Sequence, residues 1–300
     1  MSLRILNPGP LAVIEDLGRP GLADIGVSPS GALDRGALRL GNRLLGNNEG
    51  CAGIEILLEG FEVRFDDPAW FAVTGAIGPL DLDGQPVDPH RALFAPAGST
   101  LRIGTPTAGV RSYLTVRGGI DVPSVLGSRS SDLLSGLGPA TLAAGDSLPV
   151  GEHPDAEIPL LDFLPVDPPA DGVVEVRAHL GPRAEWFTAG ALDAFFSVEW
   201  EFSAESNRVG ARLDPVRQPA HVVGRDPHPA VLLERAITAE LPSELMVAGS
   251  VQVSPDGRPT VLLADHPVTG GYPAIAVVAS ASLDLLAQLR PGQRLTFRHA

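Results

Sequence analysis

Glycine and proline interrupt this chain along its whole length. The 300 residues include 34 Gly and 29 Pro, spread through the sequence rather than gathered in a tail. Gly permits left-handed backbone, and Pro fixes φ and removes an N–H donor, so long uninterrupted helices are disfavoured. We therefore predict many short elements joined by tight turns, as in β-rich proteins. With 44% hydrophobic residues the chain can build one large or two medium cores.

Short apolar runs follow one another in the N-terminal half and predict strands. These runs cover residues 11–17, 53–58, 61–65, 69–74, 91–96 and 110–116. Residues 32–45 instead repeat their apolar positions close to every 3.6 residues, which predicts a helix. Ser30 is the expected N-cap, and Asn47, after Gly46, is the expected left-handed C-terminal cap.

The C-terminal half repeats the strand pattern after a segment rich in Pro and Asp. Strands are predicted at 173–180, 198–203, 250–253, 260–264, 274–278 and 294–298, with a helix at 282–289. We predict a mainly β chain with few short helices and two domains, 1–151 and 172–300, joined by a connection at 152–171. Asp-Gly turns at 83–84 and 256–257 suit a duplicated barrel, but the same dipeptide forms hairpin turns in any β protein.

Charge and composition exclude several classes of function. The formal net charge is −14, and no basic patch offsets it, so nucleic acid and anionic membranes are poor partners. All 22 basic residues are Arg. Without Lys there is no pyridoxal phosphate aldimine, no Walker loop and no biotinylated lysine. Cys51 is the single cysteine, and the histidines lack metal-ligand spacing, so we predict neither a disulfide nor zinc.

The start of the chain and its hydropathy predict a cytoplasmic location. Residues 1–5 do not begin a signal peptide, and no apolar run reaches the roughly 18 residues of a membrane helix. We therefore expect a soluble protein.

Three clusters of polar residues among Gly and Pro are candidates for chemistry. The first covers residues 15–21 and 26–34, where Arg19 can fork onto an anion and carboxylates can move a proton. A capped turn before the predicted helix is the alternative. The second covers 202–210, where Arg208 either binds an anion or pairs on the surface with Glu205 at i,i+3 spacing.

The third cluster begins where the predicted strand 260–264 stops. Asp265, His266 and Tyr272 supply acid, base and hydroxyl groups there, while Gly270 and Gly271 let backbone approach a ligand. A purely structural loop is the alternative. Asp256 is better explained as a turn former than as a catalyst.

Taken in order, these clusters resemble the carboxyltransferase-type family that includes the C subunit of 5-oxoprolinase and allophanate hydrolase subunit 2. The matching motifs are Asp-Leu-Gly-Arg at 16–19, Ser-Gly-Ala-Leu-Asp at 30–34, Gly-Asn at 41–42 and 46–47, Leu-Gly-Ser-Arg-Ser at 126–130, Glu-Ser-x-Arg-x-Gly at 205–210, Gly-Ser-x-Gln-Val at 249–253 and Asp-His-x-x-Thr-Gly-Gly-Tyr-Pro at 265–273. The resemblance extends over nearly the whole chain. This sequence differs from the usual family pattern at Asn207, where Asp is common, at Ala211, where Tyr is common, and at Pro267-Val268, where a polar pair is common.

The resemblance implies cyclophilin-like barrels and a complex with B-like and A-like partner subunits of 5-oxoprolinase. This complex opens 5-oxo-L-proline to L-glutamate at the expense of ATP, with activity only in the complex. The resemblance suggests as catalytic residues Asp34, Asp265, His266 and Tyr272. It suggests as substrate-binding residues Asp16, Arg19, Ser28, Asn42, Arg208, Gln252, Thr269, Gly270 and Gly271. Asp16 and Asp34 are candidates to hold magnesium with ATP.

Two other functions remain open at this stage. One is a biotin-dependent carboxyltransferase component of the urea carboxylase or allophanate hydrolase type, whose biotin must arrive on a separate carrier because this chain has no Lys. The other is a non-catalytic regulatory partner that binds the B-like protein, thereby blocking the inhibition of a sensor kinase by that protein.

Overall fold

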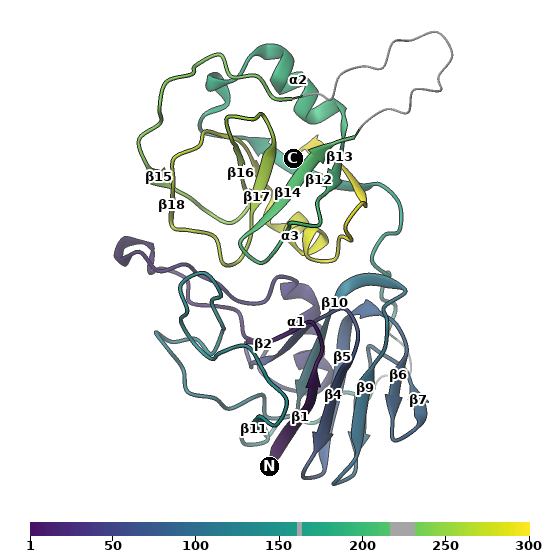
Figure 1. Cartoon of the computed structure of the whole chain (residues 1–300). Helices are drawn as coiled ribbons and strands as arrows, with labels where there is room; N and C mark the ends of the chain where they lie inside the picture. Colours follow the sequence, from purple (N-terminus) through teal and green to yellow (C-terminus); the bar gives the residue numbers. More distant parts are fainter. Residues whose placement is uncertain (161–163, 217–231) are drawn as a thin grey trace, which may run out of the picture. The chain divides into compact units, whose positions relative to one another are not determined.

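The computed structural model describes residues 1–160, 164–216 and 232–300, which form two compact units. Unit 1 comprises Met1–Leu22 and Pro29–Pro169, and unit 2 comprises Ala23–Ser28 and Ala170–Ala300. The chain passes from unit 1 to unit 2 within the Pro-rich segment 152–171 (Figure 1). The short segment Ala23–Ser28, which includes residues 26–28 of the N-terminal polar cluster, belongs to unit 2.

Unit 1 is built from two antiparallel sheets. The first contains, in spatial order, β11 (Ser147–Pro149), β1 (Ser2–Pro8), β4 (Phe61–Phe65), β9 (Thr100–Ile103), β6 (Leu80–Leu82) and β7 (Gln85–Val87). The second contains β2 (Leu11–Glu15), β3 (Gly53–Leu57), β10 (Ala108–Val116), β5 (Ala69–Ile77) and β8 (Leu93–Ala95). The Asp83-Gly84 turn joins β6 to β7 with both residues at positive φ, as its sequence predicted.

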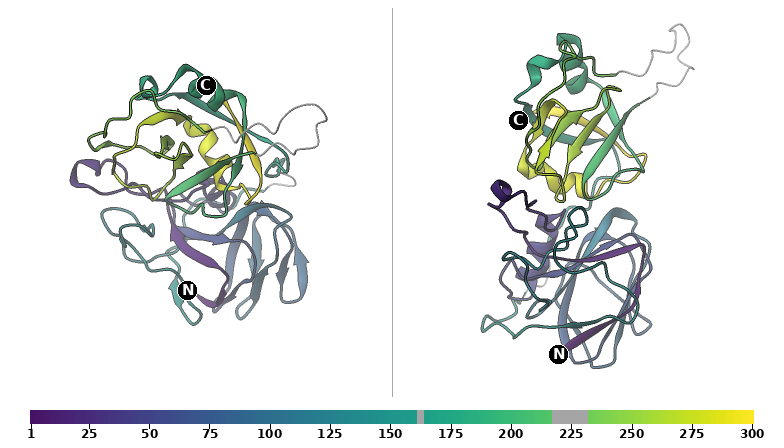
Figure 2. Two further views of the ribbon diagram at one scale, coloured as in Figure 1. Left: turned by 45° about the horizontal axis from the view of Figure 1, so that its top comes forward. Right: turned by 60° about the vertical axis from the view of Figure 1, so that its left-hand side comes forward.

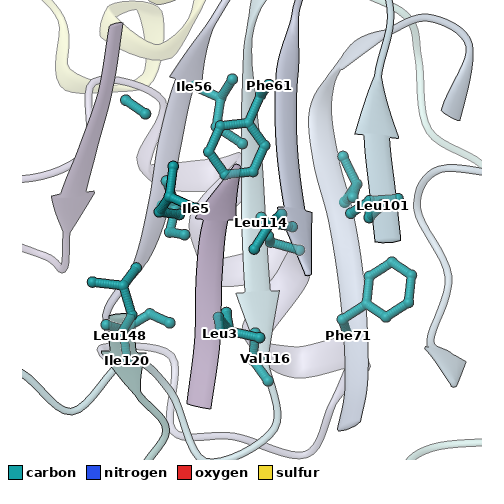
Figure 3. Close-up of a cluster of buried hydrophobic side chains, with 14 of the residues drawn as sticks. Leu3, Ile5, Ile56, Phe61, Phe71, Leu101, Leu114, Val116, Ile120 and Leu148 are labelled. Carbon is teal, nitrogen blue, oxygen red and sulfur yellow. The ribbon is translucent and has the colours of Figure 1, made fainter. Parts of the chain in front are cut away.

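Both sheets turn apolar side chains into one common core. Strand β4 buries Phe61, Val63 and Phe65 and leaves the intervening Glu62 and Arg64 half-buried, which is the alternation of a strand with one face toward the core. Leu3 and Ile5 of β1 and Leu114 and Val116 of β10 lie in the same cluster (Figure 3).

Helix α1 (Arg35–Leu44) lies against β5 and β10. It is shorter than predicted because its N-cap is Asp34, whose carboxylate accepts the N–H of Ala37, and not Ser30. At the other end Gly46, with φ +66°, ends the helix, so the left-handed position predicted for Asn47 is wrong. The absence of a side chain at Gly41 lets the helix approach the sheet, since a Cβ there would lie 2.6 Å from Thr115 Oγ1.

Unit 2 contains a closed barrel. Its strands, in order around the ring, are β12 (Val174–Leu180), β19 (Ala274–Val278), β16 (Ser250–Val253), β17 (Pro259–Leu262), β14 (Gly210–Pro215), β13 (Glu199–Phe202) and β20 (Arg294–His299). Parallel pairing of β12 with β20 closes the ring, and its other neighbouring strands are antiparallel. Strands β14, β16 and β17 can be followed side by side in Figure 1 and, in green to yellow-green, in Figure 2. A two-stranded sheet, β15 (Glu244–Leu245) and β18 (Thr269–Gly270), stands beside the ring.

In the described part of unit 2 the barrel is accompanied by the helices α2 (Ala189–Ser197) and α3 (Ser280–Ala287), with 3-10 turns at Ala23–Ile25 and Ala184–Trp186. The sequence pattern did not reveal α2 because its apolar residues do not gather on one face. The helix is nevertheless fixed by packing, since Phe195 stacks on Phe297 with ring centroids 4.3 Å apart.

The prediction of a mainly β chain with few short helices is confirmed. The predicted strands did not include β1, β6, β7, β9, β11, β14, β15 and β18, because their apolar residues are too few or too interrupted by polar residues to stand out. No helix in the part of the chain that the structure describes has the length and apolarity needed to span a bilayer.

Replacing Phe61 by Ala tests the core of unit 1. The ring is fully buried between the two sheets, so the change should lower the free energy of unfolding by about 3–5 kcal/mol. The matched change Phe94→Ala should cost only about 1 kcal/mol, since that ring is 48% exposed and loses mainly its contact with Trp70. Urea denaturation followed by circular dichroism measures both, and equal losses would contradict this description of the core.

Candidate functional site

Asp16 is the centre of a buried hydrogen-bond network in unit 1. Its Oδ1 accepts from the Ser128 and Ser130 hydroxyls, both at 2.6 Å, and from the Gly18 N–H at 2.7 Å. Its Oδ2 accepts the Arg129 N–H at 2.7 Å. The carboxylate therefore ties the loop after β2 to the loop 126–130, and these two motifs of the sequence meet for a structural reason.

Two glycines let the chain cross itself next to Asp16. Gly18 has φ +84°, and a Cβ there would lie 2.4 Å from the Pro29 carbonyl oxygen. Gly31 likewise lies close to the other segment, since a Cβ placed there would be 2.8 Å from the Gly18 nitrogen. The Arg19 N–H donates to the Pro29 carbonyl at 2.7 Å. The glycines of both motifs are thus required by close backbone approach.

Arg19 is a buried cation held by carbonyl groups. Its Nη2 donates to the Ser130 carbonyl and its Nε to the Val125 carbonyl at 3.3 Å. Its Nη1 has no hydrogen-bond partner in the described parts of the chain, and no carboxylate there lies within ion-pair distance. Of the binding residues predicted in unit 1, Arg19 is the one that keeps a donor available.

A second buried network, which the sequence analysis missed, surrounds Tyr113 of β10. The Tyr113 hydroxyl donates to Glu55 Oε2 at 2.7 Å and accepts the Asp34 N–H at 2.8 Å. Glu55 also accepts the Leu33 N–H and lies 3.5 Å from Arg111 Nε. Burial, followed by the neighbouring Glu55 charge, raises the pKa of Tyr113 well above its ordinary value of 10.0. This network fixes the entry to α1, including the predicted catalytic residue Asp34.

A signal for this network was present in the sequence. The predicted strand 110–116 contains the polar or charged residues Arg111, Ser112, Tyr113 and Thr115 among its apolar ones. In the structure the strand is buried on both faces, one against the core and the other against α1, so these polar groups require internal partners.

Asn42 and Asn47 hold the C-terminal end of α1. The Asn42 amide donates to the Cys51 and Glu49 carbonyls and accepts from Asn47, while Asn47 also donates to Val116. These contacts occupy the Asn42 amide. Its predicted role in substrate binding stays a prediction.

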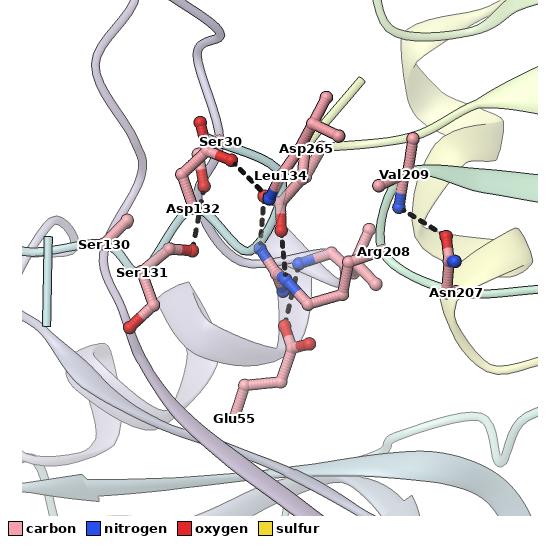
Figure 4. Close-up of polar contacts among 12 residues, drawn as sticks. Ser30, Glu55, Ser130, Ser131, Asp132, Leu134, Asn207, Arg208, Val209 and Asp265 are labelled. Carbon is pink, nitrogen blue, oxygen red and sulfur yellow. Dashed lines mark hydrogen bonds and ion pairs between the residues drawn. The ribbon is translucent and has the colours of Figure 1, made fainter. Parts of the chain in front are cut away.

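In unit 2, Arg208 and Asp265 form a fully buried ion pair. Arg208 Nε donates to Asp265 Oδ2 at 2.9 Å and Nη2 donates to Oδ1 at 3.0 Å, a bidentate geometry (Figure 4). The Asp265 N–H also donates to the Arg208 carbonyl at 3.0 Å. The expected surface pair of Arg208 with Glu205 is wrong, because Glu205 binds Arg212 instead at 2.9 Å.

The loop that follows Asp265 contains His266, which is almost completely buried. Its Nδ1 lies 2.8 Å from the Pro267 carbonyl oxygen, which can only accept, so the neutral ring carries its proton on Nδ1. The basic atom is then Nε2, which has no partner among the described residues. Ser28, also in unit 2, donates to the Ala264 carbonyl at 3.1 Å, directly before this loop.

The Gly-Gly segment lies close to Gln252 of β16. A Cβ at Gly270 would lie 2.2 Å from Gln252 Nε2, and this amide donates to the Tyr272 carbonyl at 3.2 Å. Thr269 is exposed in β18, and the Tyr272 side chain is 46% exposed. Unit 2 contains the predicted residues Ser28, Arg208, Gln252, Asp265, His266, Thr269, Gly270, Gly271 and Tyr272. Asp16, Arg19, Asp34 and Asn42 belong to unit 1.

Asp256 forms the turn between β16 and β17, as expected. Its Oδ1 accepts the Arg258 N–H, and Gly257 has φ +78°. Within residues 1–160, 164–216 and 232–300, no three His, Cys, Asp or Glu side chains gather as a set of metal ligands.

Comparison with known proteins decides the family. The model of the carboxyltransferase domain, subdomain A and B, matches residues 25–299. The chain belongs to this carboxyltransferase family. It is 37% identical over 304 residues to the 5-oxoprolinase C subunit of Escherichia coli, covering 98% of this chain and 90% of that protein.

Other members of the family are much longer. Urea amidolyase of Saccharomyces cerevisiae is 32% identical over 313 residues, which cover 99% of this chain but 16% of the yeast protein. The crystal structure of the Kluyveromyces lactis urea amidolyase superimposes with a TM-score of 0.86 at 28% identity, covering 99% of this chain and 18% of that one. The motif resemblance found in the sequence is therefore confirmed.

The buried Tyr113 predicts a specific pH dependence of stability. In the unfolded chain this hydroxyl should ionise near pH 10.0, whereas in the folded chain its pKa is well above that value. The folded state then holds one more proton, so stability should fall as the pH rises above about 10, by up to about 1.4 kcal/mol per pH unit. Unfolding free energies between pH 8 and 11 measure this.

Tyr113→Phe should remove that contribution, whereas Tyr272→Phe, at the other tyrosine of the chain, should retain it. Burial also raises the pKa of Cys51, but Cys51 titrates in all three chains and cancels in the comparison. Identical pH profiles for the wild type and Tyr113→Phe would contradict the prediction.

Proposed function

We propose that this chain is the C subunit of an ATP-dependent 5-oxoprolinase, which converts 5-oxo-L-proline to L-glutamate together with subunits of the B and A types. The observation that carries this proposal is the 37% identity to the Escherichia coli 5-oxoprolinase C subunit, over 90% of that protein. A second protein of that name, from Haemophilus influenzae, is 35% identical over 98% of this chain. The length of the match favours the same place in a complex.

The reaction opens a resonance-stabilised lactam. In the overall reaction, 5-oxoproline, ATP and two waters give glutamate, ADP and phosphate. The C–N bond of the ring is broken. Coupling to ATP fits transfer of a phosphoryl group to the lactam oxygen, which makes the ring carbon a better electrophile. A basic group that accepts a proton from the attacking water then assists the step.

Within this chain, His266 is the best candidate for that base. Its Nδ1–H is engaged by the Pro267 carbonyl, so the lone pair of the neutral ring is on Nε2, which has no described partner. Because His266 is only 2% exposed, the attacking water would have to reach a buried atom. Gly270 and Gly271, with no side chains in the way, are suited to offer N–H groups to developing negative charge.

Asp265 is better assigned to positioning than to proton transfer. Its two oxygens bind the Arg208 guanidinium, and removing the carboxylate would leave a buried cation at a cost of about 3–5 kcal/mol. An Asp265→Ala variant would thus lose activity through misfolding whatever its chemical role. His266 permits a cleaner test.

The residues suggested for magnesium do not fit a cation in this chain. The Asp16 carboxylate accepts four hydrogen bonds, and Asp34 caps α1. We therefore assign no ATP step to these residues and propose that nucleotide and metal are bound elsewhere in the complex.

The second candidate is a carboxyltransferase component that moves a carboxyl group from biotin to a urea-like acceptor. It is favoured by the 32% identity to yeast urea amidolyase and the TM-score of 0.86 to its Kluyveromyces lactis relative. This chain covers only 16–18% of those proteins and has no Lys, so biotin would have to come on another polypeptide.

His266→Ala tests the proposed base. In the complex reconstituted from this chain and its co-purified B-type and A-type partners, ATP-dependent glutamate release should fall by about 100-fold or more in kcat. His179→Ala, which changes an exposed histidine of the same barrel, should keep near wild-type activity. Wild-type kcat for a folded His266→Ala complex would remove this residue from the mechanism.

Avidin separates the two candidate functions. The 5-oxoprolinase proposal predicts glutamate release that avidin does not change, because no biotin takes part. Loss of activity on adding avidin would favour the carboxyltransferase. Tight binding of this chain to the B-type partner without any ATP turnover would instead favour a regulatory role.

A further inference from the structure

The cation expected to hold a substrate carboxylate in unit 2 is already occupied. Two nitrogens of Arg208 bind the two oxygens of Asp265, and the pair is shielded from water. A carboxylate ligand at Arg208 would have to displace Asp265 from a buried site. Another cation near the Gly-Gly loop is therefore a better candidate.

Arg235 is that cation, and the sequence analysis did not identify it. It lies in the segment 232–246, which hydrogen bonds anchor to the rest of unit 2. Arg235 itself forms a β-bridge with Phe187, and the neighbouring Leu233 N–H donates to the Gly257 carbonyl at 3.0 Å. The Ala236 N–H donates to the Trp186 carbonyl at 2.8 Å. Arg235 is thus held by the backbone on both sides.

The Arg235 guanidinium lies over the Tyr272 ring, with its carbon 5.8 Å from the ring centroid. Its Nη2 donates to the Val253 carbonyl, and the Val253 N–H donates to the carbonyl of Pro273, the residue after Tyr272. These contacts place the guanidinium beside the last residues of the Asp-His-x-x-Thr-Gly-Gly-Tyr-Pro motif. This placement uses contacts within unit 2 alone.

The positive charge of Arg235 has no counter-ion among the described residues. No carboxylate in the described part of the chain lies within ion-pair distance of it, and its buried Nε has no hydrogen-bond partner there. Arg183, in the same unit, contrasts with it, since its Nε binds both oxygens of Glu244 at 3.1 and 3.2 Å. Partial burial also lowers the pKa of the Arg235 guanidinium, so an anion beside it would be stabilising.

We propose that Arg235 and Tyr272 form a subsite for the carboxylate of a small organic acid. A guanidinium has five N–H groups in a planar fork that matches a carboxylate, and Arg235 uses one of them for the Val253 carbonyl. The half-exposed Tyr272 side chain gives access from solvent and supplies a hydroxyl. The identity of the acid as 5-oxo-L-proline rests on the proposed function, whereas the subsite does not.

Arg235→Gln tests the subsite, because Gln removes the charge but keeps an amide donor for the Val253 carbonyl. In the reconstituted complex we expect KM for 5-oxo-L-proline to rise about tenfold to a hundredfold, with kcat within about twofold. Arg235→Lys, which keeps charge but loses the fork, should give an intermediate KM. The control Arg258→Gln removes an exposed cation paired with Asp214 and should leave KM unchanged.

Direct binding separates failure of the subsite from failure of the proposed function. Saturation-transfer NMR on the full chain should detect 5-oxo-L-proline with the wild type and lose about tenfold in affinity with Arg235→Gln. The neutral lactam 2-pyrrolidinone should bind both chains equally weakly. Carboxylate binding without glutamate formation would retain the subsite and reject the oxoprolinase. Unchanged KM and affinity in a folded Arg235→Gln chain, or a defect confined to assembly of the complex, would overturn the subsite.

Discussion

The buried Arg208–Asp265 ion pair is the interaction on which the candidate chemistry of unit 2 depends. Two charges at 0–2% exposure are tolerated only because their bidentate geometry satisfies both, and either one alone would cost about 3–5 kcal/mol. The pair joins the loop before β14 to the loop after β17. It therefore fixes the start of the segment that carries His266 and the two glycines, and it withdraws Arg208 from ligand binding.

In unit 1 a buried charge is likewise satisfied by its partners, but here the partners are neutral hydrogen-bond donors. Asp16 gathers two serine hydroxyls and two backbone N–H groups, so its charge is stabilised by hydrogen bonds rather than by a cation. Several conspicuous polar residues of the sequence thus hold loops in place. Arg19, His266 and Arg235 are among the residues that keep a buried atom without a described partner, and they are better candidates for contact with a ligand.

The sequence predicted what depends on local chemistry. Strands such as β4, β16 and β19 have the boundaries that alternation and turn residues indicated, and the Asp83-Gly84 hairpin formed where expected. The sequence did not predict which residues pack together or which distant residues pair. The partner of Arg208 is 57 residues away, the Ser130 hydroxyl that Asp16 binds is 114 away, and α2 is stabilised by Phe297 rather than by its own periodicity. No local pattern encodes such pairs, so the motif residues could be located but their partners could not.

The exclusive use of Arg bears on how these sites work. A buried Lys readily loses its proton, whereas the guanidinium stays charged and offers several donors in fixed directions. Arg19, Arg111 and Arg208 can therefore be nearly completely buried and remain cations in a chain of net charge −14. An acidic surface repels small anions, so a carboxylate ligand gains most where a cation lacks its own counter-ion. Neutral urea could accept hydrogen bonds from such a cation but would lack the charge–charge attraction that a carboxylate has, so the proposed Arg235 subsite, which has no counter-ion among the described residues, would favour an acid.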